Sequence, residues 1–295
     1  MKKLLLTVII VLSLIGCSAA KNTSGSIIDM AGRTIELSEP VTSVVALAPA
    51  DCEIVYALGA EDLLVGRGEY CDYPGAALEL PIVATGGDTN IEQIISLNPS
   101  LVIMDTMAQS EEQVRQLERA GVKVAVTDAD SISEVYDAIT LIGTVIGKPG
   151  SADALIADMK REFDDLEAVV ETDDTIYFEV SPLESKLWTA GGDTFMTEIA
   201  EMVGLENAFA DVEGWAEISE EQVIDRNPDY IVTIAMDYGE GPNPVDEIKS
   251  RRGWEEIDAV KNDNVWILDS NELTRPGPRL TNAAKSLLEL LNEGE

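Results

Sequence analysis

Short runs of β-branched and other apolar residues alternate with amphipathic helical patterns along most of the chain, and this alternation restricts the fold more than any other feature. Parallel strands need a crossover between them, usually a helix, so such alternation indicates parallel sheets. In the first half the predicted strands are Val41–Leu47, Leu64–Gly66, Leu101–Met104 and Val122–Val126, and the predicted helices are Glu53–Leu58, Ile91–Leu97, Glu111–Ala120 and Ile132–Ile146. The sequence therefore predicts an α/β fold.

The second half of the chain repeats this alternation. Its predicted strands are Thr175–Val180, Tyr230–Ile234 and Val265–Leu268, and its predicted helices are Phe195–Val203, Ser219–Asp225 and Leu280–Leu291. Asn98-Pro99 in the first half and Asn227-Pro228 in the second each stand between a predicted helix and a buried strand. Because proline ends a helix, the two dipeptides mark the same kind of junction. We expect two related lobes, over residues 27–149 and 173–295.

The segment between the two halves has a different pattern. Leu155, Met159, Phe163 and Leu166 recur at helical spacing, and no glycine or proline interrupts Ser151–Val170. This pattern predicts one long amphipathic helix, which we place at residues 150–172. A helix is stiff, so we expect little hinge closure and a cleft between the lobes that is already formed.

The N-terminal residues have the pattern of an export signal. Lys2 and Lys3 precede the apolar run Leu4–Leu14, which is too short to span a bilayer as a helix, so residues 1–16 are predicted to be a signal peptide. The ending Leu14-Ile15-Gly16-Cys17 resembles the lipobox of prokaryotic lipoproteins, which implies lipidation at Cys17. The alternative is an ordinary cleaved signal in which Cys17 is incidental. The small and polar residues that follow predict a flexible tether over 17–26.

Charge and composition exclude several classes of function. The net charge of −35 repels phosphates, so nucleic acid is not an expected partner. The chain contains no histidine, which removes histidine-based catalytic triads, histidine-bearing zinc sites and histidine-ligated haem. The glycines of Gly143–Lys148 are one residue too close for a phosphate-binding loop, so we expect a helix end there. We predict no catalytic residue, no cofactor and no metal site.

Three segments together carry a family resemblance. They are Ala48–Gly59, the stretch Leu64–Pro74, and Asn271–Arg279 near the C-terminus. With the long central helix, they resemble the binding proteins of iron-siderophore, haem and cobalamin ABC importers, from about Ile27 to Leu291. The loop Tyr70-Cys71-Asp72-Tyr73-Pro74 is most similar to the cobalamin-binding branch. The resemblance implies two doubly wound, three-layer α/β lobes bridged by one rigid helix, with the ligand held between the lobes.

The resemblance also implies a set of ligand-binding residues: Tyr70, Trp188, Trp215, Asn271 and Arg275. A corrin is a broad apolar disc fringed by amides, which suits aromatic faces and a few orienting polar groups. Each aromatic could instead serve packing, and Arg275 could instead pair with a neighbouring acid.

Relatives with a more apolar first-lobe wall have aromatic residues at positions that correspond to about Gly86 and Asp105. The wall is therefore expected to be more polar here, and a corrinoid precursor, another cobamide or a polar iron chelate remains an alternative ligand.

The remaining residues implied by the resemblance concern delivery of the ligand. Glu53 and Glu221 match the glutamates that dock on permease arginines, so both are expected to be exposed; Glu220 is adjacent to Glu221. Acids in first helical turns are also favoured by the helix dipole alone. Cys52 and Cys71 are either two free buried thiols or a disulfide that staples the loops of the first lobe.

These expectations combine into one function. The chain is expected to be a monomeric solute-binding lipoprotein at the outer face of the cytoplasmic membrane. It is expected to capture cobalamin or a related corrinoid and to deliver it to the permease of an ABC importer. The alternative ligands are a ferric siderophore and haem, whose iron only tyrosine or methionine could ligate in this chain. A chelatase-type enzyme of the same fold is a further alternative, but such enzymes need a histidine or a comparable base in the cleft.

Overall fold

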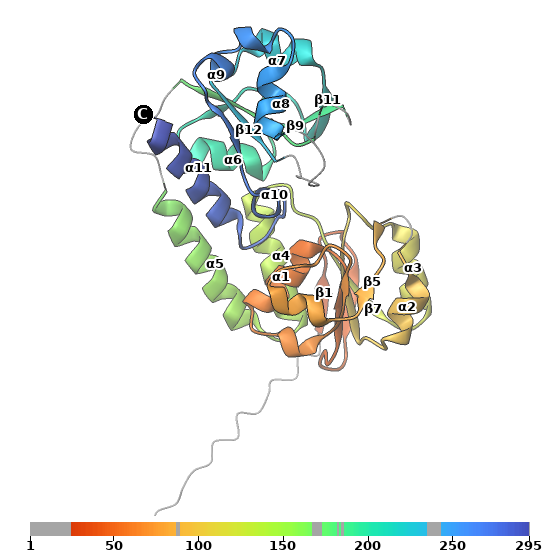
Figure 1. The fold of residues 1–295 in the computed structure, drawn as a ribbon. Coiled ribbons are helices and arrows are strands. Elements are labelled where there is room, and N and C mark those ends of the chain that lie inside the picture. The colour runs from red at the N-terminus through yellow and green to blue at the C-terminus, as the bar shows by residue number, and fades with distance from the viewer. Residues whose placement is uncertain are drawn as a thin grey trace, which may run out of the picture.

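The computed structural model describes residues 25–86, 89–166, 173–181, 183, 186–234 and 243–294. The predicted signal peptide and Cys17 lie outside the described residues. The described chain forms two lobes, and a long helix runs along one side of both (Figure 1). Among the described residues, no helix is long and apolar enough to cross a membrane.

The first lobe is built on a five-stranded parallel sheet in the order β5-β4-β3-β6-β7. Its strands are β3 (Val44–Ala46), β4 (Leu64–Gly68), β5 (Ile82–Val83), β6 (Leu101–Asp105) and β7 (Lys123–Thr127). Its helices are α1 (Pro49–Ala57), α2 (Ile91–Ser96), α3 (Glu111–Arg119) and α4 (Ile132–Val145), with short 3-10 turns at Glu61–Leu63 and Gly75–Glu79. The predicted elements of this half are all present.

Side chains of the sheet alternate between two packed faces. Val44 and Ile103 pack in one core with residues of α1 and α4, such as Ile54. Val45 and Val102 point to the other face and pack with residues of α2 and α3. Successive residues of a strand face opposite sides, so a strand buried on both sides is apolar at every position. The lobe therefore has three layers, as the sequence predicts.

A two-stranded antiparallel hairpin, β1 (Gly25–Ile28) and β2 (Thr34–Leu37), precedes this sheet. Its turn is fixed to β7, because the Met30 amide donates to the Val126 carbonyl and the Val126 amide donates to the buried Asp29 carboxylate. The predicted tether was placed up to residue 26, and this is wrong for Gly25 and Ser26. Both are strand residues, since their pairing with β2 begins at Gly25.

The second lobe is built on a four-stranded parallel sheet in the order β10-β8-β12-β13. Its strands are β8 (Thr175–Glu179), β10 (Glu206–Asn207), β12 (Tyr230–Thr233) and β13 (Val265–Ile267), and a separate antiparallel ribbon contains β9 (Leu187–Ala190) and β11 (Trp215–Ile218). Its helices are α6 (Phe195–Met202), α7 (Glu220–Arg226), α8 (Pro244–Ser250), α9 (Asp258–Lys261), α10 (Ser270–Leu273) and α11 (Leu280–Gly294), with a 3-10 turn at Trp254–Glu256. The sequence had not predicted the ribbon, β10, or α8 to α10.

The two sheets begin their central strands in the same way. Asn98 and Asn227 both adopt left-handed backbone conformations, with φ of 51° and 46°, directly before the prolines. Two residues later, the Ser100 hydroxyl accepts from the amide of Ser43, and the Asp229 carboxylate accepts from the amide of Thr175. In both lobes this side chain ties the strand to the start of its neighbour in the sheet, which supports the predicted relation between the halves.

The connecting helix is α5 (Pro149–Asp164). It begins with proline in its first turn, where a missing amide hydrogen costs nothing. It ends before the predicted boundary, since Asp165 and Leu166 form a turn; residues 167–172 lie outside the described residues.

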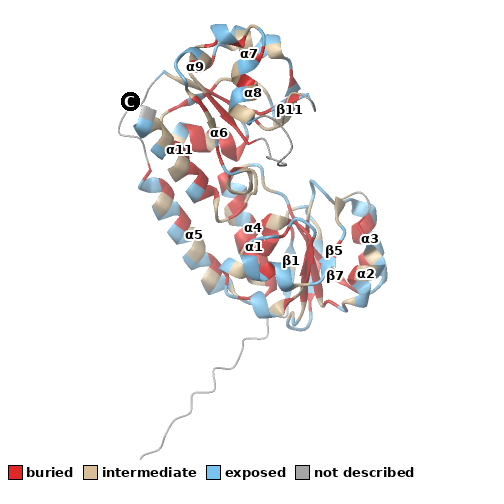
Figure 2. Cartoon of the chain, viewed as in Figure 1, coloured by how far each residue is buried: buried red, intermediate tan, exposed pale blue. Residues whose placement is uncertain are grey.

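Met159 and Phe163 of α5 belong to one continuous core that includes Ile54 of the first lobe and Leu287 of the second. Figure 2 shows this burial running from the first sheet past α4 toward α6 and α11. Lys285 of α11 also donates to Glu162 of α5 at 2.7 Å. The lobes therefore share apolar core as well as chain, which opposes movement of one against the other.

Candidate ligand-binding cleft

A cavity of about 750 Å³ lies between the lobes. The first lobe lines it with the start of α1 and the segments that follow β4, β6 and β7, and the second lobe lines it with α10 and the residues after it. Parallel sheets place their strand-following loops at one edge, where α/β proteins bind ligands. The lining residues are Pro49, Ala50, Tyr70, Asp72, Asp105, Thr106, Met107, Asp128, Ala129 and Asp130 from the first lobe, and Ser270, Asn271, Thr274, Arg275 and Pro276 from the second.

Two large apolar side chains of the cavity are exposed to solvent. Tyr70 is 65% exposed and Met107 is 76% exposed. Such side chains on a cavity wall provide contact area for a ligand, and the thioether of methionine adapts to irregular shapes. Tyr70 was predicted from the sequence. Met107 was not, although it stands two residues beyond a buried strand.

Two charged residues that line the cleft, Asp72 and Arg275, belong to one network of ion pairs. Arg275 donates to Glu53 at 2.9 Å, to Asp72 at 2.6 Å and to the Tyr70 carbonyl at 3.2 Å. Arg279 donates to both oxygens of Glu53 at 2.7 and 2.9 Å, and its guanidinium lies 4.2 Å from the centre of the Tyr73 ring. These arginines follow α10, so the network ties the second lobe to the first. Charged hydrogen bonds of this kind are the strong ones.

This network corrects the prediction that Glu53 is exposed for docking. Glu53 is only 4% exposed, and both of its carboxylate oxygens accept hydrogen bonds from arginines of the same chain. Arg275 and Arg279 shield this side chain from solvent, whereas an acid near the start of a helix is otherwise expected to be exposed. For Arg275 the ion-pair alternative is confirmed, and the residue also lines the cavity.

The two predicted tryptophans are not among the residues that line the cavity. Trp188 on β9 pairs with Glu217, and Trp215 on β11 pairs with Ala190, so both tryptophans project from the same face of the ribbon. The Trp215 indole donates to the carboxylate of Asp130, a cavity residue, at 3.3 Å. Through Trp215, the ribbon therefore contacts the first-lobe wall of the cleft.

Glu221 lies on the surface in the first turn of α7. Hydrogen bonds from its own backbone amide and from the Ser219 hydroxyl lower the pKa of its carboxyl. Its exposure agrees with the prediction, in contrast to Glu53. Glu220 beside it is half-buried.

Cys52 and Cys71 are free and buried, which was the first of the two alternatives. The Cys71 thiol lies 3.7 Å from the carbonyl oxygens of both Ala46 and Leu47, so it has acceptors as a thiol. A hydrogen bond with Cys52 and burial raise the pKa of the Cys71 thiol far above its usual value. Both residues thus act as small apolar core residues beside the cleft.

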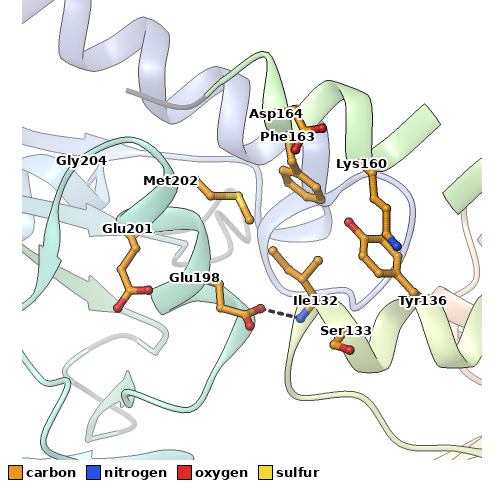
Figure 3. A pocket seen from close by; sticks show the side chains of 10 residues that line it. All are labelled: Ile132, Ser133, Tyr136, Lys160, Phe163, Asp164, Glu198, Glu201, Met202 and Gly204. Atoms are coloured by element: carbon orange, nitrogen blue, oxygen red, sulfur yellow. Dashed lines mark hydrogen bonds between the residues drawn. The ribbon is translucent and has the colours of Figure 1, made fainter. Parts of the chain in front are cut away.

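A second cavity, of about 760 Å³, lies at the junction of α4, α5 and α6 (Figure 3). Here the Glu198 carboxylate of the second lobe accepts from the Ile132 amide of the first at 2.5 Å. The Phe195 amide also donates to the Asp130 carbonyl at 2.6 Å. Asp130 lines the first cavity and Ile132 lines the second. The two hydrogen bonds therefore join the first lobe to the second at a point between the two cavities.

The first-lobe wall of the cleft is acidic. Asp105, Asp128 and Asp130 line it, and the fully buried Asp51 lies directly behind, accepting from the Thr127 hydroxyl at 2.9 Å. Burial, and then the charge of Asp105, raise the pKa of Asp51 to about 8. The predicted polar wall is therefore present at Asp105, whereas Gly86 is not among the lining residues.

Comparisons with known proteins agree with this architecture. The sequence matches the periplasmic binding protein family over residues 44–272. It is 35% identical over 271 residues to an uncharacterised ABC transporter substrate-binding lipoprotein of Bacillus subtilis, covering 88% of this chain and 83% of that protein. It is 30% identical over 254 residues to a vitamin B12-binding protein of Vibrio cholerae, covering 85% and 90%.

A solved structure gives the same result for the fold. The periplasmic haem-binding protein of Roseiflexus sp. RS-1 superposes with a TM-score of 0.77 at 27% identity, covering 85% of this chain and 98% of that one. The two-lobe α/β architecture is therefore shared with solute-binding proteins. The chain belongs to the periplasmic binding protein family, whose members are substrate-binding proteins of transporters and not enzymes.

Proposed function

We propose that this protein captures cobalamin or a related corrinoid outside the cytoplasm and delivers it to an ABC importer. The observation that carries the proposal is the cavity between the lobes, with the exposed Tyr70 and Met107 on one side and Asn271 and Arg275 on the other. Its volume suits a ligand much larger than an amino acid or a sugar. The similarity to a vitamin B12-binding protein supports a corrinoid.

Haem or a ferric siderophore is the second candidate ligand. The observation that favours haem is that Tyr70 and Met107, residue types able to ligate haem iron, both line the cavity. A haem-binding protein is also among the structural relatives. The acidic wall opposes haem, because haem carries two propionates that would face Asp105 and Asp128.

The cellular location is inferred from the N-terminal sequence. We infer that residues 1–16 are removed, that Cys17 carries a lipid, and that the protein is a monomer at the outer face of the cytoplasmic membrane. The lipobox-like ending before Cys17 and the description of the Bacillus subtilis relative as a lipoprotein support this.

The tryptophan face of the ribbon provides a test of where the ligand lies. Replacing Trp188 and Trp215 together by alanine is expected to weaken cobamide binding by a few kcal/mol, about 100-fold or more, because large aromatic contacts dominate binding centres. The corrin should quench the tryptophan fluorescence of the unaltered protein at a one-to-one ratio. Titration calorimetry and fluorescence measure both quantities.

The matched control replaces the same two residues by phenylalanine, which keeps flat apolar faces and should retain most of the affinity. Trp215 packs on Phe195 with ring centres 5.6 Å apart, so thermal melting should accompany the titrations. Unchanged affinity in a folded double alanine variant would place the ligand away from the ribbon.

Delivery requires a contact with the permease, and we propose that Glu221 makes it. Its exposed carboxylate at a helix start is free to meet a permease arginine. Glu221→Arg should reduce ligand-stimulated ATPase activity of the reconstituted importer while ligand affinity stays unchanged, since charge complementarity sets encounter and orientation. Glu206→Arg, an exposed change on β10, is the control. Normal stimulation by Glu221→Arg would remove this residue from the interface.

A further inference from the structure

The acids of the first-lobe wall come from the ends of adjacent strands. Asp105 ends β6, and Asp128 follows β7, its neighbour in the sheet. Asp130 lies two residues further on, before α4. The carboxyl ends of parallel strands meet at one edge of a sheet, so the three side chains line one wall of the cavity.

Each of these carboxylates accepts hydrogen bonds from neutral donors. Asp105 accepts from the Ala108 amide at 2.9 Å, Asp128 from the Thr106 hydroxyl at 2.5 Å, and Asp130 from the Trp215 indole at 3.3 Å. Within the part of the chain that the structure describes, none of the three lies in a salt bridge. Their negative charge is therefore not balanced by a neighbouring cation.

Arg275, which lines the cavity, does not neutralise the charge of the three aspartates. Arg275 is engaged by Glu53 and Asp72, and Arg279 is engaged by Glu53. Arg279 also lies 3.7 Å from the Glu272 carboxylate, so the network contains two arginines and three carboxylates and has no positive charge to spare. The cavity therefore carries the uncompensated charge of the three aspartates.

A buried carboxyl beneath the wall is independent evidence that this side of the cavity does more than pack the core. Asp51 is 1% exposed, and its Oδ2 atom has no hydrogen-bond partner among the described residues. Its other oxygen accepts from Thr127, which is the register partner of Asp105 in the sheet. Ala50, the residue before Asp51, lines the cavity. An unpartnered buried polar group is costly and uncommon, so its position behind Asp105 points to a role in the site.

We propose that Asp105, Asp128 and Asp130 make the cleft selective for a positively charged ligand. Given the corrinoid function proposed above, on which this inference rests, the preferred ligand is a corrinoid without the nucleotide loop. Such a corrinoid keeps the positive charge of its cobalt centre, whereas in a complete cobamide the phosphate of the loop offsets it. Anionic chelates, including haem with its propionates, are disfavoured by the same wall.

The physical basis is the weak screening inside a cleft. At an effective dielectric constant of about 20, two unit charges 4 Å apart interact by roughly 4 kcal/mol, against about 1 kcal/mol in water. Even a fraction of this interaction energy would make a cationic corrinoid bind measurably more tightly than a neutral corrinoid with the same ring. The selectivity should also fall as salt is added, because part of the wall is open to solvent.

The test compares the loop-free cationic corrinoid with the complete cobamide by calorimetry at low and high salt. The unaltered protein is expected to prefer the cationic ligand at least tenfold at low salt. In Asp105→Asn/Asp128→Asn, affinity for the cation should fall about tenfold more than affinity for the complete cobamide, so the preference for the cation is lost. Asparagine keeps the oxygen that accepts from Ala108 and from Thr106, so folding should be preserved.

The matched control is Asp153→Asn, which removes one charge from the exposed side of α5 and should leave both affinities unchanged. Equal affinity of the unaltered protein for the two corrinoids, or equal weakening of both in the double variant, overturns the inference. If neither corrinoid binds, the corrinoid function itself has failed. The charge inference is then tested with a ferric trihydroxamate carrying a free amine and with its neutral acetylated form, and equal affinity for those two overturns it.

Discussion

Replacing Glu53 by alanine is expected to destabilise the protein by about 3–4 kcal/mol. The change leaves the Arg275 and Arg279 guanidiniums without the carboxylate that both contact in a nearly buried position. Breaking a buried ion pair from one side typically costs about 3–5 kcal/mol, because the remaining charge stays desolvated. The network crosses between the lobes, so corrinoid affinity should fall as well. Chemical denaturation and calorimetry measure the two effects.

Glu79→Ala is the matched control for this experiment. Glu79 is exposed in a 3-10 turn of the same lobe, and its replacement should change the free energy of unfolding by less than about 0.5 kcal/mol. The opposite pattern for Glu53→Ala, with full stability and affinity but lost stimulation of the importer, would restore the docking role that the sequence resemblance implies.

Replacing Asp51 by asparagine is expected to stabilise the protein strongly at alkaline pH. The folded pKa of Asp51 is raised from 3.8 to about 8, mainly by burial. Between these values the unfolded chain releases the proton and the folded protein retains it, so stability falls as pH rises, by about 1.4 kcal/mol per pH unit at most. Asparagine cannot ionise and removes this loss. The difference between variant and unaltered protein should be below about 1 kcal/mol at pH 4 and on the order of 6 kcal/mol at pH 9.

Urea denaturation across this pH range measures the difference directly. Asp137→Asn, an exposed change on α4, should show no such pH-dependent gain. A constant difference between Asp51→Asn and the unaltered protein from pH 4 to pH 9 would mean that Asp51 ionises normally in the folded state.

The sheet strands and long helices that the sequence predicted could be recognised because their buried residues form patterns within a short stretch of sequence. β6 is apolar at four successive positions, as a strand packed on both faces must be, and its end falls at Asp105. Met159 and Phe163 of α5 are buried as their helical spacing predicts. The end of α5 was not predictable in this way, since acidic residues continue with no proline or glycine where the turn at Asp165 begins.

The burial of Glu53 could not be read from local sequence. Its partner Arg275 is 222 positions away, and an acid in the first turns of a helix is usually solvated. The ribbon of β9 and β11 was missed for a related reason. Its strands mix exposed and buried residues over only four positions each, and their pairing is long-range. Contacts between distant segments decided both outcomes.

Three cleft residues that were not predicted from the sequence share a recognisable position. Met107, Asp128 and Asp130 all stand one to three residues beyond a buried parallel strand, which is the edge of a sheet where ligands bind. The same rule would have selected them without any resemblance. Asp72 and Arg279 have no such signal, because their roles arise from the network between the lobes.

Binding of a corrinoid in the cleft is tested most directly by one separation experiment. The mature protein without its lipid is incubated with a mixture of corrinoids, haem and a ferric siderophore, and the visible absorption of the protein fraction is recorded after gel filtration. The predicted result is a corrinoid spectrum at one equivalent per protein, lost in Trp188→Ala/Trp215→Ala. A protein fraction that carries only haem or the ferric siderophore, or no chromophore at all, would contradict the account.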